Sequence, residues 1–321
     1  MVKVVVAGAI NWDINLFVPR FPRPGEETPV LRITRLPGGK AGNVAVAAAR
    51  LLGPHEVGII GALGRDDIAD TQQRLLESEG VDTSAISLKA AAESGQAYII
   101  TDESGENVIH TYFGANALLK PTDIMSEKIQ EMIRSAVITT VTDPPEDTVL
   151  KLAEIAQEAG KPIAWDPGIR AKAGMQQLRD ILVRTRYLLL NEVEAEYMTG
   201  VSEPAEAAKR LSEMNPDLTA ILKSGNEGCT MFKGRTAIRV KGIDLSEYGL
   251  RVVNTVGCGD AFLGAFSAAK ALSLGDEESV HWANWAGAFK ATKAETRGSP
   301  TMDEFEKWIA RMKNYGAPAE V

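Results

Sequence analysis

A short turn in the last quarter of the chain joins an apolar run to a helix-like stretch and carries groups suited to phosphoryl chemistry. Residues 250–253 predict a strand and residues 261–272 predict a helix. Between them, Gly257 and Gly259 leave the N–H groups of the first helical turn free to approach a negative oxygen. Asp260 adds a carboxylate that could take a proton from a hydroxyl attacking a phosphoryl group. The turn therefore predicts phosphoryl transfer.

A second glycine-rich segment lies near the N-terminus and precedes an alanine-rich, helix-like run at residues 44–52. Gly38 and Gly39 permit the close approach of a ligand, while Lys40 and Asn43 can donate hydrogen bonds to its hydroxyls. The segment is not a Walker loop, because no Gly-Lys-Ser/Thr follows at the required spacing. Taken alone, it fits either substrate binding or an ordinary turn at the start of a helix.

Two short polar side chains, Asn11 and Asp13, follow the first apolar run of the chain, at residues 4–7. An aspartate carboxylate can accept hydrogen bonds from two adjacent sugar hydroxyls, and an asparagine amide can both donate and accept. Asn and Asp also occupy turns and helix caps routinely, so a structural role is the alternative. The position alone leaves both interpretations open.

Asn191 and Glu194 come directly after the apolar run at residues 187–190. An acidic side chain one turn beyond a strand end can organise water around Mg²⁺, whose usual ligands are few carboxylates together with waters and phosphate oxygens. Glu194 is therefore a candidate for holding the metal through water. The alternative is an ordinary acidic first helical turn, which the helix dipole favours regardless of function.

A polar loop follows the apolar run at residues 220–222 and contains Lys223, Ser224, Gly225 and Gly228. Lysine is a common partner of phosphate, so this loop could contact the phosphates of a nucleotide through its backbone and side chains. A reverse turn before the next apolar run is the alternative interpretation.

The composition is that of an ordinary globular chain without a basic surface. Of its 321 residues, 45% are hydrophobic and 24% are charged, and the formal net charge is -8. This charge argues against a nucleic-acid-binding or anionic-membrane-binding role. The sequence has no run of about 20 apolar residues and no metal-binding histidine spacing. Its two cysteines, Cys229 and Cys258, are too few for a disulfide framework, which favours a cytoplasmic location.

From about residue 120 onward, short apolar runs alternate with longer helix-like stretches. Strands that are apolar throughout are typical of a parallel sheet whose two faces are buried by crossover helices. We therefore predict an α/β fold with a doubly wound, mostly parallel sheet flanked by helices. Ligands of such sheets bind beyond the carboxyl ends of the strands. Polar residues at those positions include Asp143, Asp166 and Lys223.

Two segments interrupt this alternation and predict a small β lid. The first is rich in Pro and Arg, and the second resembles a hairpin that turns at residues 102–105. Residues 316–321 are expected to form a frayed tail. Lid strands with exposed edges favour a homodimer joined through the lids. We assign the lid to residues 17–36 and 96–112, and an α/β nucleotide- and substrate-binding domain to residues 1–16, 37–95 and 113–321.

Five motifs together make the chain resemble the ribokinase/PfkB family of carbohydrate kinases. The two signature regions of that family correspond to residues 38–43 and 254–262, in the order and separation that the family shows. Residues 8–13, 114–117 and 191–194 also resemble family elements. The resemblance covers nearly the whole chain, so it favours the functional interpretation of each motif.

The resemblance implies an ATP- and Mg²⁺-dependent kinase that phosphorylates a hydroxyl of a sugar or nucleoside. It implies that Asp260 is the catalytic base and that Gly257, Cys258 and Gly259 form the anion hole, with lid strands that close over the sugar. The residues expected to bind the substrate are Asn11, Asp13, Gly38, Gly39, Lys40, Asn43, Asn116, Asp143 and Arg170, and those expected to bind the nucleotide and metal are Asn191, Glu194, Lys223, Ser224, Gly225 and Gly228.

The sequence indicates the type of reaction more clearly than it indicates the substrate. Residues 114–117 and the Gly-Gly-Lys motif resemble ribokinases, so a ribose-type substrate is favoured. Nucleosides, fructose 6-phosphate, 2-keto-3-deoxygluconate and inositol are alternatives, as are ADP as donor and a noncatalytic sugar-binding regulator. A phosphosugar would require a cationic clamp, for which Arg170 is a candidate, with an intradomain ion pair as the other explanation.

The chain departs from the family pattern at Asn254. Many relatives carry Asp here, at a position associated with a monovalent-cation loop that orders the anion hole. A carboxamide attracts a cation less strongly than a carboxylate does, so potassium activation is left open. Cys258 stands where Ala is common, and we expect it to be tolerated because the group needed there is its backbone N–H.

Overall fold

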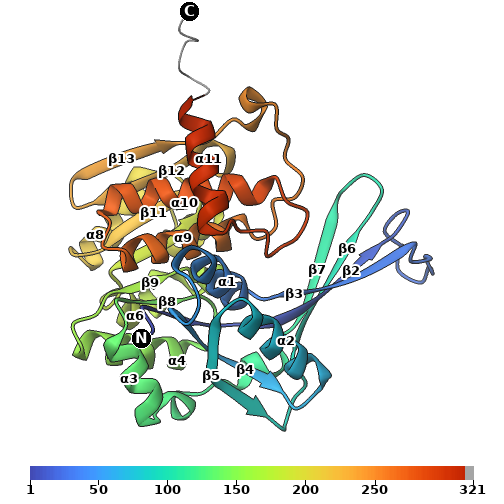
Figure 1. The fold of residues 1–321 in the computed structure, drawn as a ribbon, viewed down its shortest axis with the longest axis horizontal. Coiled ribbons are helices and arrows are strands. Elements are labelled where there is room, and N and C mark those ends of the chain that lie inside the picture. Colours follow the sequence, from blue (N-terminus) through green and yellow to red (C-terminus); the bar gives the residue numbers. More distant parts are fainter. Residues whose placement is uncertain (315–321) are drawn as a thin grey trace, which may run out of the picture.

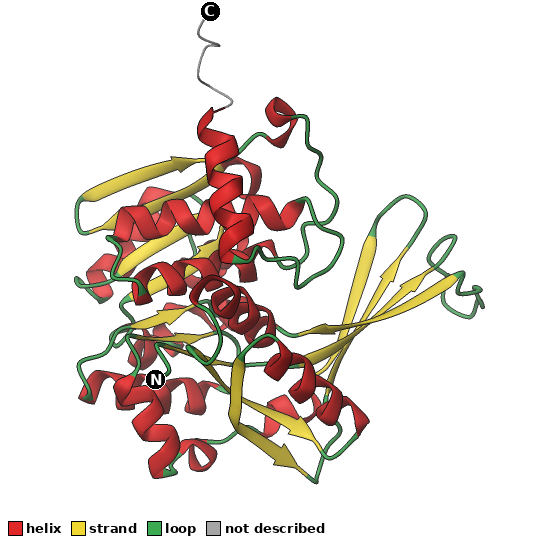
Figure 2. Cartoon of the chain, in the orientation of Figure 1, coloured by secondary structure: helices red, strands yellow, loops and turns green. Residues whose placement is uncertain are grey.

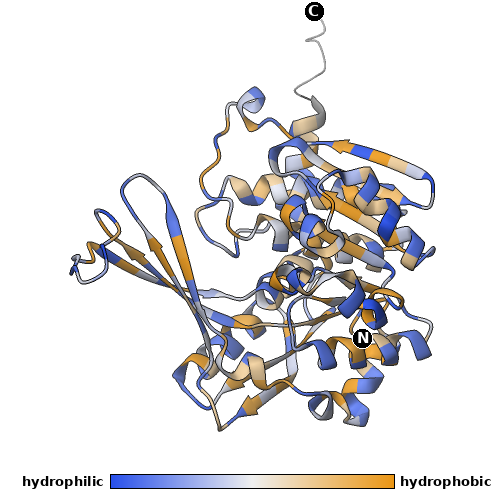
Figure 3. Ribbon diagram, turned by 180° about the vertical axis from the view of Figure 1, so that it is seen from behind, coloured by the Kyte–Doolittle hydropathy of each residue, from blue (hydrophilic) through white to orange (hydrophobic). Residues whose placement is uncertain are grey.

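The main sheet of the computed structural model, which describes residues 1–314, is built from strands that are largely apolar (Figure 3). Nine strands lie in the order β13-β12-β11-β10-β9-β8-β1-β4-β5. Strand β12 is antiparallel to both of its neighbours, and all other neighbouring pairs are parallel. The doubly wound, mostly parallel sheet is therefore confirmed. The strands are β1 Val4–Ala7, β4 Val57–Gly64, β5 Val81–Lys89, β8 Ile138–Val141, β9 Ile163–Trp165, β10 Tyr187–Asn191, β11 Thr219–Lys223, β12 Gly228–Lys233 and β13 Thr236–Lys241.

Helices cover both faces of this sheet (Figures 1 and 2). Alternate residues of β1 belong to different cores, with Val4 and Val6 packing on one face and Val5 and Ala7 on the other. The face of Val4 and Val6 carries α1 Lys40–Leu52, α2 Asp67–Ser78, α9 Cys258–Ala271 and α10 Asp276–Ala291, with α11 Met302–Asn314 packed outside them. The opposite face carries α3 Glu127–Ser135, α4 Glu146–Glu158, α6 Arg179–Leu182, α7 Glu192–Thr199 and α8 Pro204–Met214, with the short α5 Gly174–Gln177 beside α7.

A second, four-stranded sheet projects from the α/β body (Figure 1). Its order is β3-β2-β6-β7, and the predicted hairpin is formed by β6 and β7, which pair in antiparallel fashion. Strand β2 begins well before residue 17, so this sheet reaches further into the body than the predicted lid range. The division of the chain into two domains stays a prediction. The strands are β2 Asn11–Phe17, β3 Arg32–Gly38, β6 Gly95–Thr101 and β7 Asn107–Tyr112.

The prediction of a strand at residues 250–253 is wrong. Instead of pairing with a sheet edge, the N–H groups of Val253 and Asn254 donate to the carbonyl oxygen of Ala291 at 2.8 and 3.3 Å. The side chains of Val252 and Val253 are exposed, and Leu250 is only partly buried, so these residues do not form the core face of a strand. The helix that follows is confirmed, although it begins at Cys258.

The predicted tail, residues 316–321, lies outside the described residues. Within residues 1–314, none of the helices is both long enough and apolar enough to cross a bilayer.

Helices α1 and α9 approach each other closely because small residues line their contact. A Cβ atom added at Gly264 of α9 would lie 2.5 Å from the Cβ of Ala47 and 2.8 Å from the carbonyl oxygen of Val44. Both helices begin at the glycine-rich turns that carry the candidate chemistry. The spacing between the two turns therefore depends on glycine at position 264.

We expect Gly264→Ala to lower the free energy of unfolding by about 1–3 kcal/mol, because overpacking outweighs the better helix propensity of alanine. Urea unfolding followed by circular dichroism measures this change. Gly275→Ala is the matched control, since a Cβ there meets nothing within 4 Å. Equal stability of the two variants would contradict this account of the packing.

Candidate active site

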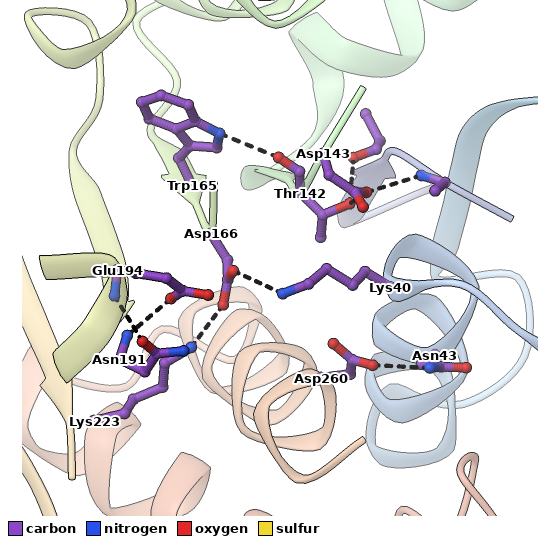
Figure 4. Close-up of polar contacts among 12 residues, drawn as sticks. Lys40, Asn43, Thr142, Asp143, Trp165, Asp166, Asn191, Glu194, Lys223 and Asp260 are labelled. Atoms are coloured by element: carbon purple, nitrogen blue, oxygen red, sulfur yellow. Dashed lines mark hydrogen bonds and ion pairs between the residues drawn. The ribbon is translucent and has the colours of Figure 1, made fainter. Parts of the chain in front are cut away.

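Polar side chains follow the carboxyl ends of four adjacent strands of the main sheet. Asp143 comes two residues after β8, Asp166 directly follows β9, and Asn191 and Lys223 end β10 and β11. The parallel register places Asn191 opposite Lys223. These residues face the N-terminal ends of α1 and α9 (Figure 4). The predicted edge of the sheet therefore gathers groups from both halves of the chain.

Asp166 lies at the centre of this edge and is buried. Its Oδ1 lies 3.0 Å from Lys40 Nζ, and its Oδ2 lies 2.6 Å from Lys223 Nζ (Figure 4). Burial alone would raise the pKa of Asp166, but the ammonium groups of Lys223 and Lys40 outweigh burial and hold that pKa well below its usual range. Asp166 therefore stays ionised and holds one lysine from α1 and another from β11.

Asp260 lies in the first turn of α9, at the position predicted for a base. Its Oδ2 accepts a hydrogen bond of 2.8 Å from the amide of Asn43 in α1 (Figure 4). Burial raises the pKa of Asp260, although the nearby Lys40 opposes the shift. A carboxylate with a raised pKa binds a proton more readily than an ordinary one, which suits a general base.

The last residue of the turn before α9 must be glycine. Gly257 has a φ of 86°, and a Cβ there would lie 2.5 Å from the carbonyl oxygen of Thr296. The N–H of Cys258 donates to the carbonyl oxygen of Thr255 at 3.1 Å. The N–H groups of Gly259 and Asp260 have no acceptor within the helix because they belong to its first turn. An anion at this turn would therefore meet these two groups first.

Asp13 lies on β2 with 7% of its surface exposed, close to the turn that begins α1. Burial raises its pKa to about 7, with Asp260 adding to the shift and Arg297 opposing it. A Cβ added at Gly38 would lie 2.2 Å from the Asp13 carboxylate, so glycine lets β3 approach this group. Gly39 precedes α1 with a φ of 85°. The predicted substrate residues Asp13, Gly38 and Gly39 are therefore neighbours.

Arg297 was not predicted, yet it holds several of these residues together. It is 8% exposed, and its guanidinium donates to the side-chain oxygen of Asn43 at 3.2 Å and to the Gly38 carbonyl at 3.0 Å. A third bond of 3.1 Å reaches Gln72. Burial lowers the pKa of Arg297 to about 10. Because the side-chain oxygen of Asn43 accepts a hydrogen bond from Arg297, the amide nitrogen of Asn43 faces Asp260.

Asn11 and Asn116 contact each other where β2 meets the turn at Gly114–Leu118. The amide of Asn116 donates to the side-chain oxygen of Asn11 at 2.8 Å and to the carbonyl of Ile10 at 3.2 Å. Its oxygen accepts from the N–H of Ile10 at 3.0 Å. Asn116 therefore joins the two segments, and its contact with a substrate stays a prediction.

Asp143 and Arg170 are neighbours, but they do not form a salt bridge. The guanidinium of Arg170 donates to the backbone carbonyl of Asp143 at 3.1 and 3.2 Å. The Asp143 carboxylate accepts from the N–H of Ala9 at 3.2 Å and from the hydroxyl of Thr142 at 2.9 Å. Among the side chains described, Arg170 forms no ion pair. Among the described side chains, the structure thus gives no support to the alternative of an intradomain ion pair for Arg170, and its contact with a substrate stays a prediction.

Asn191 and Glu194 form a capping box at the start of α7. The side chain of Asn191 accepts from the N–H of Glu194 at 2.8 Å, and the Glu194 carboxylate accepts from the N–H of Asn191 at 2.9 Å. Glu194 also points toward Lys223 and Asp166 (Figure 4). Within the described part of the chain, no three His, Cys, Asp or Glu side chains are grouped to hold a metal. This donor set fits Mg²⁺ held through water and phosphate oxygens.

The loop after β11 is a tight turn. The N–H of Ser224 donates to the carbonyl of Gly228 at 2.8 Å. Gly228 has a φ of 97°, and a Cβ there would lie 2.1 Å from the carbonyl of Val240, so glycine is required for the pairing with β13. A pocket beside the loop is lined in part by Ser224, Glu227 and Arg239. The turn is thus established for Ser224 and Gly228, while nucleotide contacts of these residues and Gly225 stay a prediction.

Comparisons with known proteins agree with this geometry. An ATP-dependent ribose-1-phosphate kinase of Halopiger xanaduensis is 30% identical over 311 residues, which cover 97% of this chain and 99% of that protein. A ribokinase of Staphylococcus aureus is 30% identical over 270 residues, covering 82% of this chain and 84% of that protein. The structure of Arabidopsis thaliana ribokinase complexed with ribose and ATP superposes with a TM-score of 0.84 at 26% identity, covering 96% and 99% of the two chains. The model of the pfkB family carbohydrate kinases matches residues 1–302, and the chain belongs to this family.

Proposed function

We propose that this chain is an ATP-dependent kinase that transfers the γ-phosphate to a hydroxyl of a ribose-type sugar. The observation that carries the proposal is the Asp260 carboxylate, which lies at the N-terminus of α9 within hydrogen-bond reach of Asn43. The carboxylate can take the proton of an attacking hydroxyl, and the helix N-terminus beside it can bind the negative oxygens of the phosphoryl group. Relatives named for ribose and ribose 1-phosphate support a pentose as the acceptor.

In this proposal the sugar lies between β2 and the start of α9. Asp13 and Asn43 bind its hydroxyls, and Asp260 accepts the proton of the attacking hydroxyl. The oxygens of the transferred phosphoryl group then meet the N–H groups of Gly259 and Asp260 and the ammonium of Lys40. Positive charge in a partly buried site stabilises the negative charge on these oxygens. The small sheet excludes water and so limits hydrolysis of ATP.

On the nucleotide side, Lys223 contacts the phosphates and the turn at Ser224 and Gly225 lies beside the nucleotide. Glu194, with Asn191 fixing its orientation, holds Mg²⁺ through water, and Asp166 keeps Lys223 directed toward the phosphates. When bound, Mg²⁺ supplies neutralising charge to the phosphate oxygens. ATP is the proposed donor because a relative is named as ATP-dependent and a solved relative contains ATP.

A phosphorylated pentose is a second candidate acceptor. The Arg170 guanidinium is held by the backbone carbonyl of Asp143 and has no carboxylate partner among the described side chains. An arginine in this state retains donors that can bind a phosphate group. The Halopiger xanaduensis relative is named for ribose 1-phosphate, which supports this alternative.

The experiment that tests the proposal is an assay of nucleotide consumption with Mg²⁺, comparing ATP with ADP as donor. The acceptors are ribose, ribose 1-phosphate, nucleosides, fructose 6-phosphate, 2-keto-3-deoxygluconate and inositol. Turnover with ribose supports the proposal, and turnover confined to phosphosugars supports the second candidate. Sugar binding without turnover under any condition would contradict the kinase and favour a noncatalytic regulator.

We expect Asp260→Asn to lower kcat by about 10²- to 10⁴-fold, because the amide cannot accept the proton of the attacking hydroxyl. Sugar affinity, measured by calorimetry, should change little. Asp303→Asn is the control, since that carboxylate is exposed and pairs with Lys307 on the surface. Normal turnover by Asp260→Asn would rule out Asp260 as the base.

Sugar affinity should depend on pH through Asp13, whose pKa of about 7 leaves it neutral below that pH and ionised above it. Only the ionised carboxylate can accept a hydrogen bond at each of its two oxygens, because protonation turns one of them into a donor. Affinity should therefore fall about tenfold between about pH 8 and about pH 6. Calorimetric titrations across this range measure the effect. Asp13→Asn should bind weakly with a flat profile, and a matching slope in that variant would contradict the assignment.

We also propose a homodimer joined through the small sheet. Ile33 on β3 and Ile109 on β7 are 46% and 54% exposed, which leaves apolar area available for a second subunit. Light scattering should report a dimer for the unaltered protein and a monomer for Ile109→Lys. Leu272→Lys, at an exposed site on the body, should stay dimeric. A monomeric unaltered protein would exclude this dimer.

A further inference from the structure

Lys290, at the end of α10, has a buried ammonium group that pairs with no carboxylate among the described residues. None of its surface is exposed. Among the side chains that the structure describes, it takes part in no salt bridge. A buried charge is destabilising unless hydrogen bonds compensate it. The ammonium must therefore be held by uncharged oxygen atoms.

Those oxygen atoms are backbone carbonyls. The Nζ atom of Lys290 lies 2.9 Å from the carbonyl oxygen of Asn254 and 3.5 Å from that of Lys293. Burial lowers the pKa of Lys290, while Cys258, Glu295 and Asp260 oppose the shift. A cation among carbonyl oxygens is the arrangement in which proteins bind monovalent metal ions.

The two carbonyls belong to different loops, and one of these loops forms the turn before α9. The amide of Asn254 donates to the carbonyl of Ala294 at 2.8 Å, and the N–H of Val253 donates to that of Ala291 at 2.8 Å. Gly257 packs directly against the carbonyl of Thr296. The segment at residues 253–257 therefore rests on the segment at residues 291–296, and Lys290 lies at their junction.

Asn254 connects the Lys290 ammonium to the start of α9, because it also contacts Val256 and Cys258. Its carbonyl oxygen, which accepts from Lys290, is also 3.9 Å from the Cys258 sulfur. Its side-chain oxygen accepts from the N–H of Val256 at 2.9 Å. A carboxylate at position 254 could not donate to Ala294 as this amide does. A neutral side chain therefore suits a site that already contains an ammonium ion.

We propose that Lys290 is a positioning residue whose tethered ammonium acts as a built-in monovalent cation, fixing the turn before α9 so that phosphoryl transfer needs no added potassium. The inference rests on the kinase function proposed above. The ammonium holds the carbonyl of Asn254 and thereby orients the N–H groups at the start of α9. It also adds positive charge next to a helix N-terminus that binds anions.

The test compares the unaltered protein with Lys290→Ala, which removes the ammonium and vacates its place between the carbonyl oxygens of Asn254 and Lys293. Turnover is measured in potassium, ammonium and tetramethylammonium chlorides at equal ionic strength. The unaltered protein should show the same kcat in all three salts. The variant should lose about tenfold or more of kcat in tetramethylammonium and recover most of it in potassium or ammonium, with the sugar KM changed much less. A merely structural lysine would not produce this recovery.

Lys270→Ala is the matched control. Lys270 also donates to a carbonyl, that of Leu274 at 2.8 Å, but it pairs with Asp276 at the far end of α9. Its loss should lower stability without any cation-dependent recovery of kcat. Potassium activation of the unaltered protein by more than about threefold would overturn the proposal whether or not Lys290→Ala folds.

Thermal unfolding separates this inference from the proposed function. Potassium and ammonium should raise the Tm of Lys290→Ala relative to tetramethylammonium, and they should leave the Tm of the unaltered protein unchanged. This readout requires no turnover, so an inactive unaltered protein would refute the kinase without deciding the role of Lys290. Equal Tm values of the variant in all salts would refute the built-in cation.

Discussion

The arrangement of polar groups in this protein depends on one buried carboxylate, that of Asp166. Its two oxygens hold Lys40, which begins α1, and Lys223, which ends β11. Without this carboxylate the two ammonium groups would repel each other in a partly buried site. Because α1 follows the glycine-rich loop and β11 leads into the turn at Ser224, Asp166 fixes the substrate side of the site relative to the nucleotide side.

Much of the site at the carboxyl ends of the strands could be predicted from sequence, because local patterns of apolar and polar residues specify it. Apolar runs predict the strands, and the parallel order brings Asp166 and Lys223 together at their ends. The same pattern failed at residues 250–253, since an apolar run does not specify its hydrogen-bond partner, here Ala291. No sequence motif marks Arg297 as a residue of the site. Its burial arises from contacts with Gly38 and Asn43, more than 250 residues away in the chain.

At the start of α7 and in the loop at Ser224, where the sequence left structural and functional interpretations open, the structure establishes the structural one without removing the other. Glu194 caps α7, as any acidic residue in a first turn could, yet it also points toward Lys223. The loop at Ser224 is a reverse turn beside a pocket. One side chain can thus stabilise an element and face a ligand, so motif analysis cannot choose between these roles when both are present.

The position of Asp13 on β2 has a mechanical consequence. Strand β2 pairs with β3 and β6 along its whole length, from Asn11 to Phe17, so a displacement of β2 would carry the small sheet with it. A sugar that binds Asp13 therefore acts directly on the sheet that projects from the body, without an intervening hinge or relay. With Asp13 as the proposed sugar ligand, occupancy of the sugar site and orientation of the projecting sheet would be coupled through the pairing of β2 with β3 and β6.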